Sequence, residues 1–332
     1  MEELLPFEKI KRKVLIKKES GSDPAFGCVP KNRLLETSLK YGIINLNKPS
    51  GPTSHQITDY VKKIFGSSKA GHSGTLDPKV TGVLPIALDN ATRIVQVLLN
   101  AGKEYVALMK IHDDVPEDKV RKEFKKLVGT ITQLPPVRSA VKRQHRQRNI
   151  YYCSILDINE RLVLFRVGCQ AGTYIRKLIH DFGLQLNSRA HMVQLVRTKA
   201  GPFKDIDWVS LQDVRDAFEF YKEGKKDALK KIIRPVEDAV SHLPKVWIFD
   251  SAINTVCHGS SLGVQGIAKL NDNIQPNELV AIMSLKDELV AMAHAAVSSD
   301  EMVSSDIGLA TTVFKVFMER NTYASKKVEG KE

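Results

Sequence analysis

The segment from residue 42 to residue 66 constrains the fold most, because a strand, a sharp stop and a helix follow one another within it. Residues 42–46 are mostly apolar and β-branched, which favours a strand. Pro-Ser-Gly-Pro at residues 49–52 ends that strand. Thr53 or Ser54 can then cap a helix that Gly66 ends. Its apolar stripe has helical spacing and comprises Ile57, Tyr60, Val61, Ile64 and Phe65.

The same alternation continues along the chain and predicts an α+β fold. Residues 105–111 and 162–169 have the composition of strands. Thr173 is expected to cap a second helix, and residues 202–243 are expected to be helical and irregular. The buried face of that second helix comprises Ile175, Leu178, Ile179 and Phe182.

Domain boundaries follow from breaks in this pattern. Residues 1–40 carry several turn residues and form an extension that needs a packing partner. Residues 41–244 form the main domain, which ends at Pro244. Residues 245–323 form a second, β-rich domain with a hairpin of strands 279–283 and 289–293, and residues 324–332 form a flexible tail.

Composition indicates a polyanionic partner. The 332 residues carry 50 Lys and Arg against 38 Asp and Glu, for a net charge of +12. Nucleic acid is the first candidate and an anionic membrane the second. The longest apolar run, residues 279–297, is interrupted by Lys286, Asp287 and Glu288, so it does not predict a membrane span.

The ends and the cysteines indicate where the protein works. The N-terminal residues lack the apolar stretch of a signal peptide, so we expect a cytoplasmic protein, or a nucleolar one if the source is eukaryotic. The four cysteines are far apart, which suggests free thiols and neither a zinc site nor a disulfide framework. No cofactor motif is present, so we expect no cofactor and no metal.

The loop of residues 71–78, Gly-His-Ser-Gly-Thr-Leu-Asp-Pro, is the richest in candidate chemistry. Its glycines allow close approach of a ligand, and Asp77 can present one carboxylate. On local chemistry alone, an ordinary turn before Pro78 is the commoner outcome. The loop is not a phosphate-binding Walker motif, and His72 has no spaced partner for a metal.

Three other residues gain meaning only beside Asp77. Arg176 lies in the first turns of the second helix, off its apolar face, where a cation could pair with that carboxylate. Lone arginines are more often solvated. Lys48 and Tyr105 are equally ambiguous alone, and Tyr105 could stack on a base only if it faces a cleft.

A basic cluster is the third signal. It follows Pro135 and Pro136, which favours a protruding loop, and it can be either a solvated loop or a contact for RNA phosphates. With the net positive charge, we expect RNA contact. The cluster comprises Arg138, Lys142, Arg143, Arg146 and Arg148.

Several motifs together resemble the TruB-type pseudouridine synthases. The catalytic loop of that family resembles residues 71–85 here, and other family motifs resemble residues 48–55, 103–105, 172–176 and 197–198. The resemblance covers most of residues 41–203 and implies a mixed, largely antiparallel sheet with flanking helices. It also implies Asp77 as the catalytic carboxylate, Arg176 as its partner and Tyr105 as the stacking ring. Tyr174 and Leu195 are implied as pocket residues, with Lys48 and His72 as neighbours.

The C-terminal part, residues 245–323, resembles a PUA domain, a small RNA-binding β-barrel. With the N-terminal extension, it resembles the dyskerin-type branch, apparently archaeal because long lysine-rich tails are missing. The resemblance implies packing of residues 1–40 on the PUA domain. It also implies H/ACA guide RNA, target rRNA or tRNA, and three partner proteins: a small zinc-ribbon-type protein, a Gar-type barrel protein and a kink-turn-binding protein.

The sequence departs from that family after the second helix. Asn187-Ser188-Arg189 stands where relatives carry glycines, so the conformation of this turn is left open. Gln170 stands where relatives usually carry Glu. Neither departure touches Asp77, and we expect an intact catalytic site.

The implied reaction moves uracil from an N1–C1′ bond to a C5–C1′ bond without redox chemistry. Asp77 could act at C1′ as a nucleophile or as a base, and both routes stay open. The alternatives are a stand-alone tRNA T-loop pseudouridine synthase and a non-catalytic RNA-binding scaffold. A glycoside-type hydrolase would need a second, opposed carboxylate, which no motif supplies.

Overall fold

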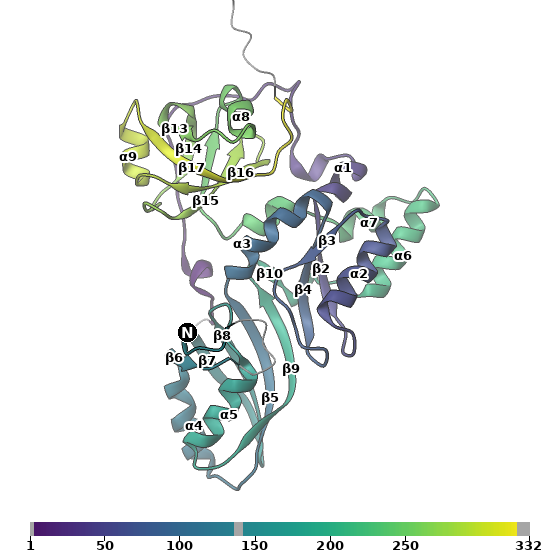
Figure 1. The fold of residues 1–332 in the computed structure, drawn as a ribbon, viewed down its shortest axis with the longest axis vertical. Helices are drawn as coiled ribbons and strands as arrows, with labels where there is room; N and C mark the ends of the chain where they lie inside the picture. Colours follow the sequence, from purple (N-terminus) through teal and green to yellow (C-terminus); the bar gives the residue numbers. More distant parts are fainter. Residues whose placement is uncertain (1–2, 136–141, 324–332) are drawn as a thin grey trace, which may run out of the picture. The chain divides into compact units, whose positions relative to one another are not determined.

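A long mixed sheet organises the larger part of the chain (Figure 1). The computed structural model describes residues 3–135 and 142–323. The strands β9, β5, β8, β7 and β6 are antiparallel in succession, whereas β4 pairs with β9 in parallel. The sheet order is β2 (Gly42–Lys48), β4 (Thr81–Leu88), β9 (Ala190–Ala200), β5 (Lys103–Ile111), β8 (Leu162–Cys169), β7 (Arg146–Asn159) and β6 (Gly129–Gln133). The mixed, largely antiparallel sheet expected from the sequence is therefore confirmed.

Short strands and helices complete this sheet. The additional strands are β3 (Ala70–His72) on β4, β10 (Phe203–Lys204) on β9 and β11 (Arg234–Pro235) on β2. The helices are α2 (Ser54–Phe65), α3 (Val95–Asn100), α4 (Glu117–Phe124), α5 (Ile175–Gln185), α6 (Leu211–Lys222) and α7 (Asp227–Ile232). The 3-10 turns of this part are Pro6–Lys9, Asp89–Ile94, Lys125–Leu127 and Asp205–Asp207.

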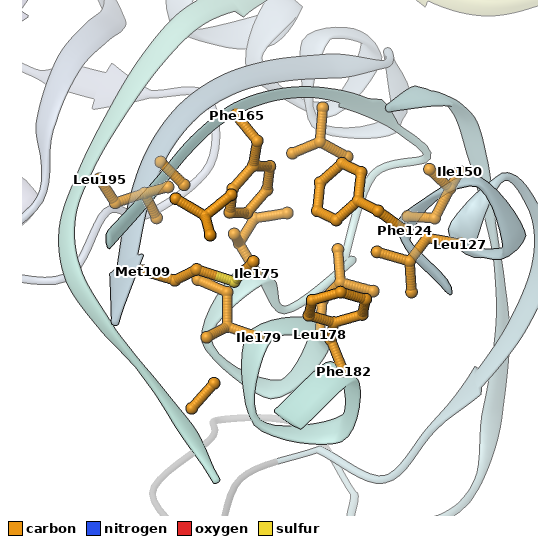
Figure 2. Packing of buried hydrophobic residues seen from close by; sticks show 14 of the residues in the cluster. Met109, Phe124, Leu127, Ile150, Phe165, Ile175, Leu178, Ile179, Phe182 and Leu195 are labelled. Carbon is orange, nitrogen blue, oxygen red and sulfur yellow. The ribbon is translucent and has the colours of Figure 1, made fainter. Parts of the chain in front are cut away.

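Helices α4 and α5 bury their apolar sides against β5 and β8 (Figure 2). The ring of Phe124 from α4 meets those of Phe165 and Phe182 edge to face, with ring centroids 5.1 and 5.3 Å apart. Burying each such side chain contributes roughly 1.5–3 kcal/mol. The face of α5 predicted from the sequence is confirmed: Ile175, Leu178, Ile179 and Phe182 are all buried.

The start of α2 also follows the prediction. The Thr53 side chain accepts from the Gln56 amide, the Gln56 side chain accepts from the Thr53 amide, and Gly66 ends the helix in the left-handed region. Tyr60, predicted as part of the apolar stripe, is 40% exposed.

The chain divides into two units, each with its own core. The first comprises residues 3–9, Ile44–Ala87 and Ile94–Ile232, and the second comprises Ile10–Ile43, Leu88–Arg93 and residues 233–323. The second unit holds a sheet ordered β1 (Val14–Ile16), β14 (Ile267–Asn271), β12 (Lys245–Ile248), β15 (Leu279–Ser284), β16 (Leu289–Ala295), β17 (Leu309–Val316) and β13 (Leu262–Gly263). Its helices are α1 (Leu35–Lys40), α8 (Asp250–Cys257) and α9 (Ser299–Ser304), with 3-10 turns Pro30–Asn32, Val236–Val240 and Val264–Gly266.

The N-terminal segment contributes to both units. Strand β1 pairs antiparallel with β14, and Arg12 Nη2 lies 2.6 Å from Glu278 Oε1 within the second unit. Residues 3–9 belong instead to the first unit, where Leu5 is fully buried and Glu8 binds Lys199 at 3.0 Å. Thus residues 3–9 are not part of the segment that packs on the C-terminal sheet.

The predicted cap of α5 is wrong, and some other predictions fall outside the described residues. Thr173 does not cap α5; its hydroxyl donates to the Gln170 carbonyl, and the helix begins two residues later. Arg138 and residues 324–332 lie outside the described residues. The four cysteines are free, and no helix within residues 3–135 and 142–323 is long and apolar enough to cross a membrane.

Candidate active site

Asp77 lies on the loop between β3 and β4, with its side chain 52% exposed. Gly74 adopts a φ of +87°, a conformation that favours glycine, and this turns the chain into the loop. The Ser54 hydroxyl, at the start of α2, accepts from the Leu76 amide at 2.9 Å and donates to the Leu76 carbonyl at 3.1 Å. Because Leu76 is itself buried, the residue before Asp77 is fixed while the carboxylate stays accessible.

Arg176 pairs with Asp77 from the first turn of α5, with Arg176 Nη2 against Asp77 Oδ2. The ion pair expected from the sequence is thus present in the structure. Both side chains are about half exposed, so solvent screens the pair and its stabilisation is small. What the pair fixes is the direction of the carboxylate.

Gln133 supports the turn that leads to Arg176, a role that the sequence did not reveal. Its side chain is buried at the end of β6, accepts from the Tyr174 amide at 3.0 Å and donates to the Tyr174 carbonyl at 3.1 Å. The backbone before α5 is therefore anchored to the sheet. Tyr174 itself is half-buried.

Tyr105 is the aromatic residue that the sequence predicts to stack on the target base. It lies on β5, half-buried, and packs on the same apolar cluster as Leu76, Leu195 and Ile175. It lies directly opposite Arg197 of β9, and its phenol interacts with the guanidinium. Burial raises the pKa of the Tyr105 phenol, and Arg197 partly offsets that rise.

Lys48 binds the backbone of the loop that carries Asp77. Its side chain is fully buried, and Nζ donates to the carbonyls of Pro49, Pro78 and Val80 at 2.8, 2.9 and 2.9 Å. The ammonium is thus committed to backbone around the residue after Asp77. Sequence reasoning expected a neighbour of the pocket, and the structure places Lys48 as a support of the loop.

His72 is a neutral, half-buried neighbour of the loop. Its Nδ1 lies 3.1 Å from the Thr58 hydroxyl and its Nε2 lies 3.3 Å from that of Thr75. Burial, and then the nearby His55, lower the pKa of His72 to about 4. His72 therefore stays uncharged at neutral pH and holds the loop by hydrogen bonds.

The basic cluster is split between a loop and a strand. Lys142 and Arg143 are exposed, whereas Arg146 and Arg148 lie on β7, opposite Gln133 and Ile131 of β6. Both arginines are only partly exposed. A protruding loop is therefore wrong for these two positions, because their backbone is held in the β6–β7 ladder.

Arg148 points toward the turn that precedes α5. A Cβ added at Gly172 would lie 3.1 Å from Arg148 Nε. Gly172 has a φ of +79°, a conformation that favours glycine, and the arginine side chain lies close beside it. The guanidinium thus packs beside the segment that carries Arg176.

The turn of residues 187–189 has a defined conformation. Asn187 takes the left-handed region at φ +57°, which Asn tolerates better than most residues. The Ser188 hydroxyl donates to Asp113 at 2.7 Å. Asn therefore serves where a glycine would also fit. Within residues 3–135 and 142–323, no group of three or more His, Cys, Asp and Glu is placed to hold a metal.

Four family models match consecutive parts of the chain. The TruB family pseudouridylate synthase N-terminal domain matches residues 62–175, and the tRNA pseudouridylate synthase B C-terminal domain matches residues 176–241. The PUA domain matches residues 244–317, and the DKCLD domain matches residues 2–58.

Relatives match along almost the whole chain. "Probable tRNA pseudouridine synthase B" of Pyrococcus abyssi is 54% identical over 323 residues, which is 96% of this chain and 96% of the relative. The protein of the same name from Methanopyrus kandleri is 51% identical over 320 residues, covering 96% and 94%.

Solved structures agree equally well. A chain in a crystal structure of a Cbf5-Nop10-Gar1 complex is 54% identical, with a TM-score of 0.92, covering 96% of this chain and 98% of that one. A chain in an H/ACA RNP bound to a substrate RNA containing 2′-deoxyuridine is 52% identical, with a TM-score of 0.91, covering 97% and 99%.

The matched domains and the mixed sheet define a pseudouridine synthase with an attached PUA domain. Such an enzyme isomerises uridine within RNA. The chain belongs to the TruB family of pseudouridine synthases, in the dyskerin-type branch whose curated relatives here are archaeal.

Proposed function

We propose that Asp77 is the carboxylate that acts at C1′ of the target uridine, as nucleophile or as base. The reaction breaks the N1–C1′ bond, forms the C5–C1′ bond, removes the C5 proton and leaves a proton on N1. The observation that carries this role is the accessible Asp77 carboxylate, held by a rigid loop and aimed by Arg176.

Tyr105 is proposed to stack on the uracil during its reorientation. A target base must leave its helical stack to reach an enzyme pocket, and an aromatic face offsets part of that cost. The half-buried Tyr105 ring, with the Leu195 side chain in the same apolar cluster, supports this role. Tyr174 is proposed to line the same pocket.

We further propose that an H/ACA guide RNA selects the uridine. The similar chains come from complexes with Nop10 and Gar1 and from an H/ACA RNP bound to a substrate RNA, and they cover nearly all of this chain. Base pairing with the guide then chooses the sequence, while protein cations hold the backbone. Proposed partners are these two proteins and a kink-turn-binding protein, and the proposed location is the cytoplasm.

Lys142 and Arg143 are proposed to contact RNA phosphates, with Arg146 and Arg148 on the adjacent strand. The first two are exposed on the segment that leads into β7. A net charge of +12 supports a polyanionic ligand. Neutralising Lys142 and Arg143 should reduce the salt dependence of RNA affinity, because fewer counterions are released on binding.

A stand-alone tRNA pseudouridine synthase is the second candidate, favoured by the name of the archaeal relatives, probable tRNA pseudouridine synthase B. One assay separates the two. Conversion of uridine is measured on a guided target and on free tRNA, each with and without partner proteins. We expect slow conversion of the guided target by the chain alone and restoration by the partners. Full-rate conversion of free tRNA, unaffected by guide or partners, would select the second candidate.

A further inference from the structure

Three buried basic side chains lie beside the loop that carries Asp77. Within the described part of the first unit, Lys48, Lys103 and Arg197 are at most 5% exposed, and they donate hydrogen bonds to main-chain carbonyls. Burying a charge without a carboxylate partner is costly. Three such side chains beside one loop therefore indicate a role other than packing of the core.

Arg197 joins three separate elements. Its Nε donates to the Val83 carbonyl on β4 at 2.7 Å, and its Nη2 donates to the Gly74 carbonyl of the Asp77 loop at 3.1 Å. Arg197 on β9 also lies directly opposite Tyr105 on β5, so that the guanidinium and the phenol interact. One planar cation thus fixes the start of the loop relative to the aromatic ring.

Arg197 lies against both Gly74 and Gly82, and the approach at Gly82 is the closer one. A Cβ added there would lie 3.4 Å from Arg197 Nη1 and 3.8 Å from Lys103 Cε. At Gly82, a Cβ would lie 2.2 Å from the Arg197 carbonyl oxygen, so β4 and β9 approach each other closely at this point. The guanidinium is therefore held in place by both its own strand and its neighbour.

The far end of the loop is fixed independently by Lys48. Its ammonium donates to the carbonyls of Pro78 and Val80, one and three residues after Asp77. The loop is therefore held on both sides of Asp77, at Gly74 by Arg197 and at Pro78 by Lys48. Of these two side chains, only Arg197 also interacts with Tyr105.

We propose that Arg197 is a positioning residue for the isomerisation, which holds the Asp77 loop and the Tyr105 ring in one fixed relation. The inference rests on the proposed roles of Asp77 and Tyr105. Arg197 is buried and acts only through these two groups. Its loss should change the rate of the chemical step more than the affinity for RNA.

The test measures single-turnover conversion at saturating RNA, with the partners that give the fastest wild-type rate. Arg197→Met should lower the rate constant about 100-fold, since misplacement by about 1 Å can cost that factor. Arg197→Lys should recover part of the loss, because it keeps one donor. RNA affinity should change little in both variants, because Arg197 is buried.

A double-mutant cycle identifies the route of the effect. Tyr105→Phe removes only the phenol hydroxyl, the group through which Tyr105 interacts with Arg197, so it carries little risk of misfolding. If the two residues act as one unit, Arg197→Met combined with Tyr105→Phe should be no slower than Arg197→Met alone. Additive losses would overturn the proposed link to Tyr105.

A matched buried arginine controls for stability. Arg33→Met removes a buried arginine of the second unit, paired with Glu237 at 2.7 Å, and should destabilise the protein without changing the single-turnover rate well below its unfolding midpoint. Rates of Arg197→Met and Arg197→Lys equal to that of Arg33→Met would overturn the proposal. If Asp77→Asn stays active, the proposed role of Asp77 fails instead, whatever the Arg197 variants show.

Discussion

Replacing Arg176 should separate catalysis from stability. The Asp77–Arg176 pair is exposed on both sides, 52% and 59%, and exposed pairs contribute about 0–1 kcal/mol. Arg176→Ala should therefore leave the unfolding midpoint in urea nearly unchanged. The carboxylate, however, loses the group that aims it, and misaiming by about 1 Å can cost 100-fold in rate. That factor corresponds to about 2.7 kcal/mol in the activation barrier.

The chain offers a matched control for this substitution. Arg121 on α4 forms an ion pair with Glu117 at 2.7 Å, with side chains 46% and 54% exposed. Arg121→Ala should have the same small effect on stability and no effect on rate. The assay is single-turnover pseudouridine formation, with RNA affinity measured separately. A wild-type rate in Arg176→Ala, or equal rates in both variants, would refute the reasoning.

Two further predictions concern buried charges, each measured by urea unfolding of the full chain. Burial, and then Arg197, lower the pKa of Lys103 to about 7. Between that value and the ordinary lysine pKa of about 10.4, the unfolded chain binds a proton that the folded chain lacks, so the free energy of unfolding rises with pH. The free energy of unfolding of the wild type, relative to that of Lys103→Met, should therefore rise from pH 7 to pH 9 by up to about 1.4 kcal/mol per pH unit. A difference between the two proteins that does not change with pH would contradict the lowered pKa. Arg33→Met should cost about 3–5 kcal/mol, because it leaves the buried Glu237 carboxylate without its cation, and Arg33→Met with Glu237→Gln should recover part of that loss. If Arg33→Met is no less stable than the double variant, the unpaired Glu237 carboxylate is not the cause of the loss.

Local patterns allowed much of the fold to be predicted from the sequence. The capping box at Thr53 and the buried face of α5 depend on contacts within a few residues, and both were predicted or partly predicted. The strands 105–111 and 162–169 lie within β5 and β8. The hairpin of the C-terminal sheet has the expected place, with β15 and β16 antiparallel.

The supports of the site were not visible because they join residues far apart in the sequence. Arg197 and Gly74 are 123 positions apart, and Gln133 and Tyr174 are 41 apart. Nothing in the local sequence around Arg197 distinguishes a buried arginine from a solvated one. The same holds for Lys48, whose burial depends on how the loop folds back over β2.

The predicted start of α5 was wrong because of a contact from another strand. Thr173 is a good N-cap residue by type, and sequence reasoning assigned it that role. In the structure its hydroxyl donates to the Gln170 carbonyl, while Gln133 binds the backbone of Tyr174. A tertiary contact from another strand therefore displaces the capping role that the sequence favoured.

The most direct test of the account is the turnover of Asp77→Asn. The substitution keeps the shape of the side chain and removes its charge, and the carboxylate is accessible enough that folding should not depend on it. Conversion of uridine is measured under multiple turnover, together with RNA affinity. The account predicts RNA affinity close to that of the wild type and no conversion above background. Sustained turnover by Asp77→Asn would contradict it.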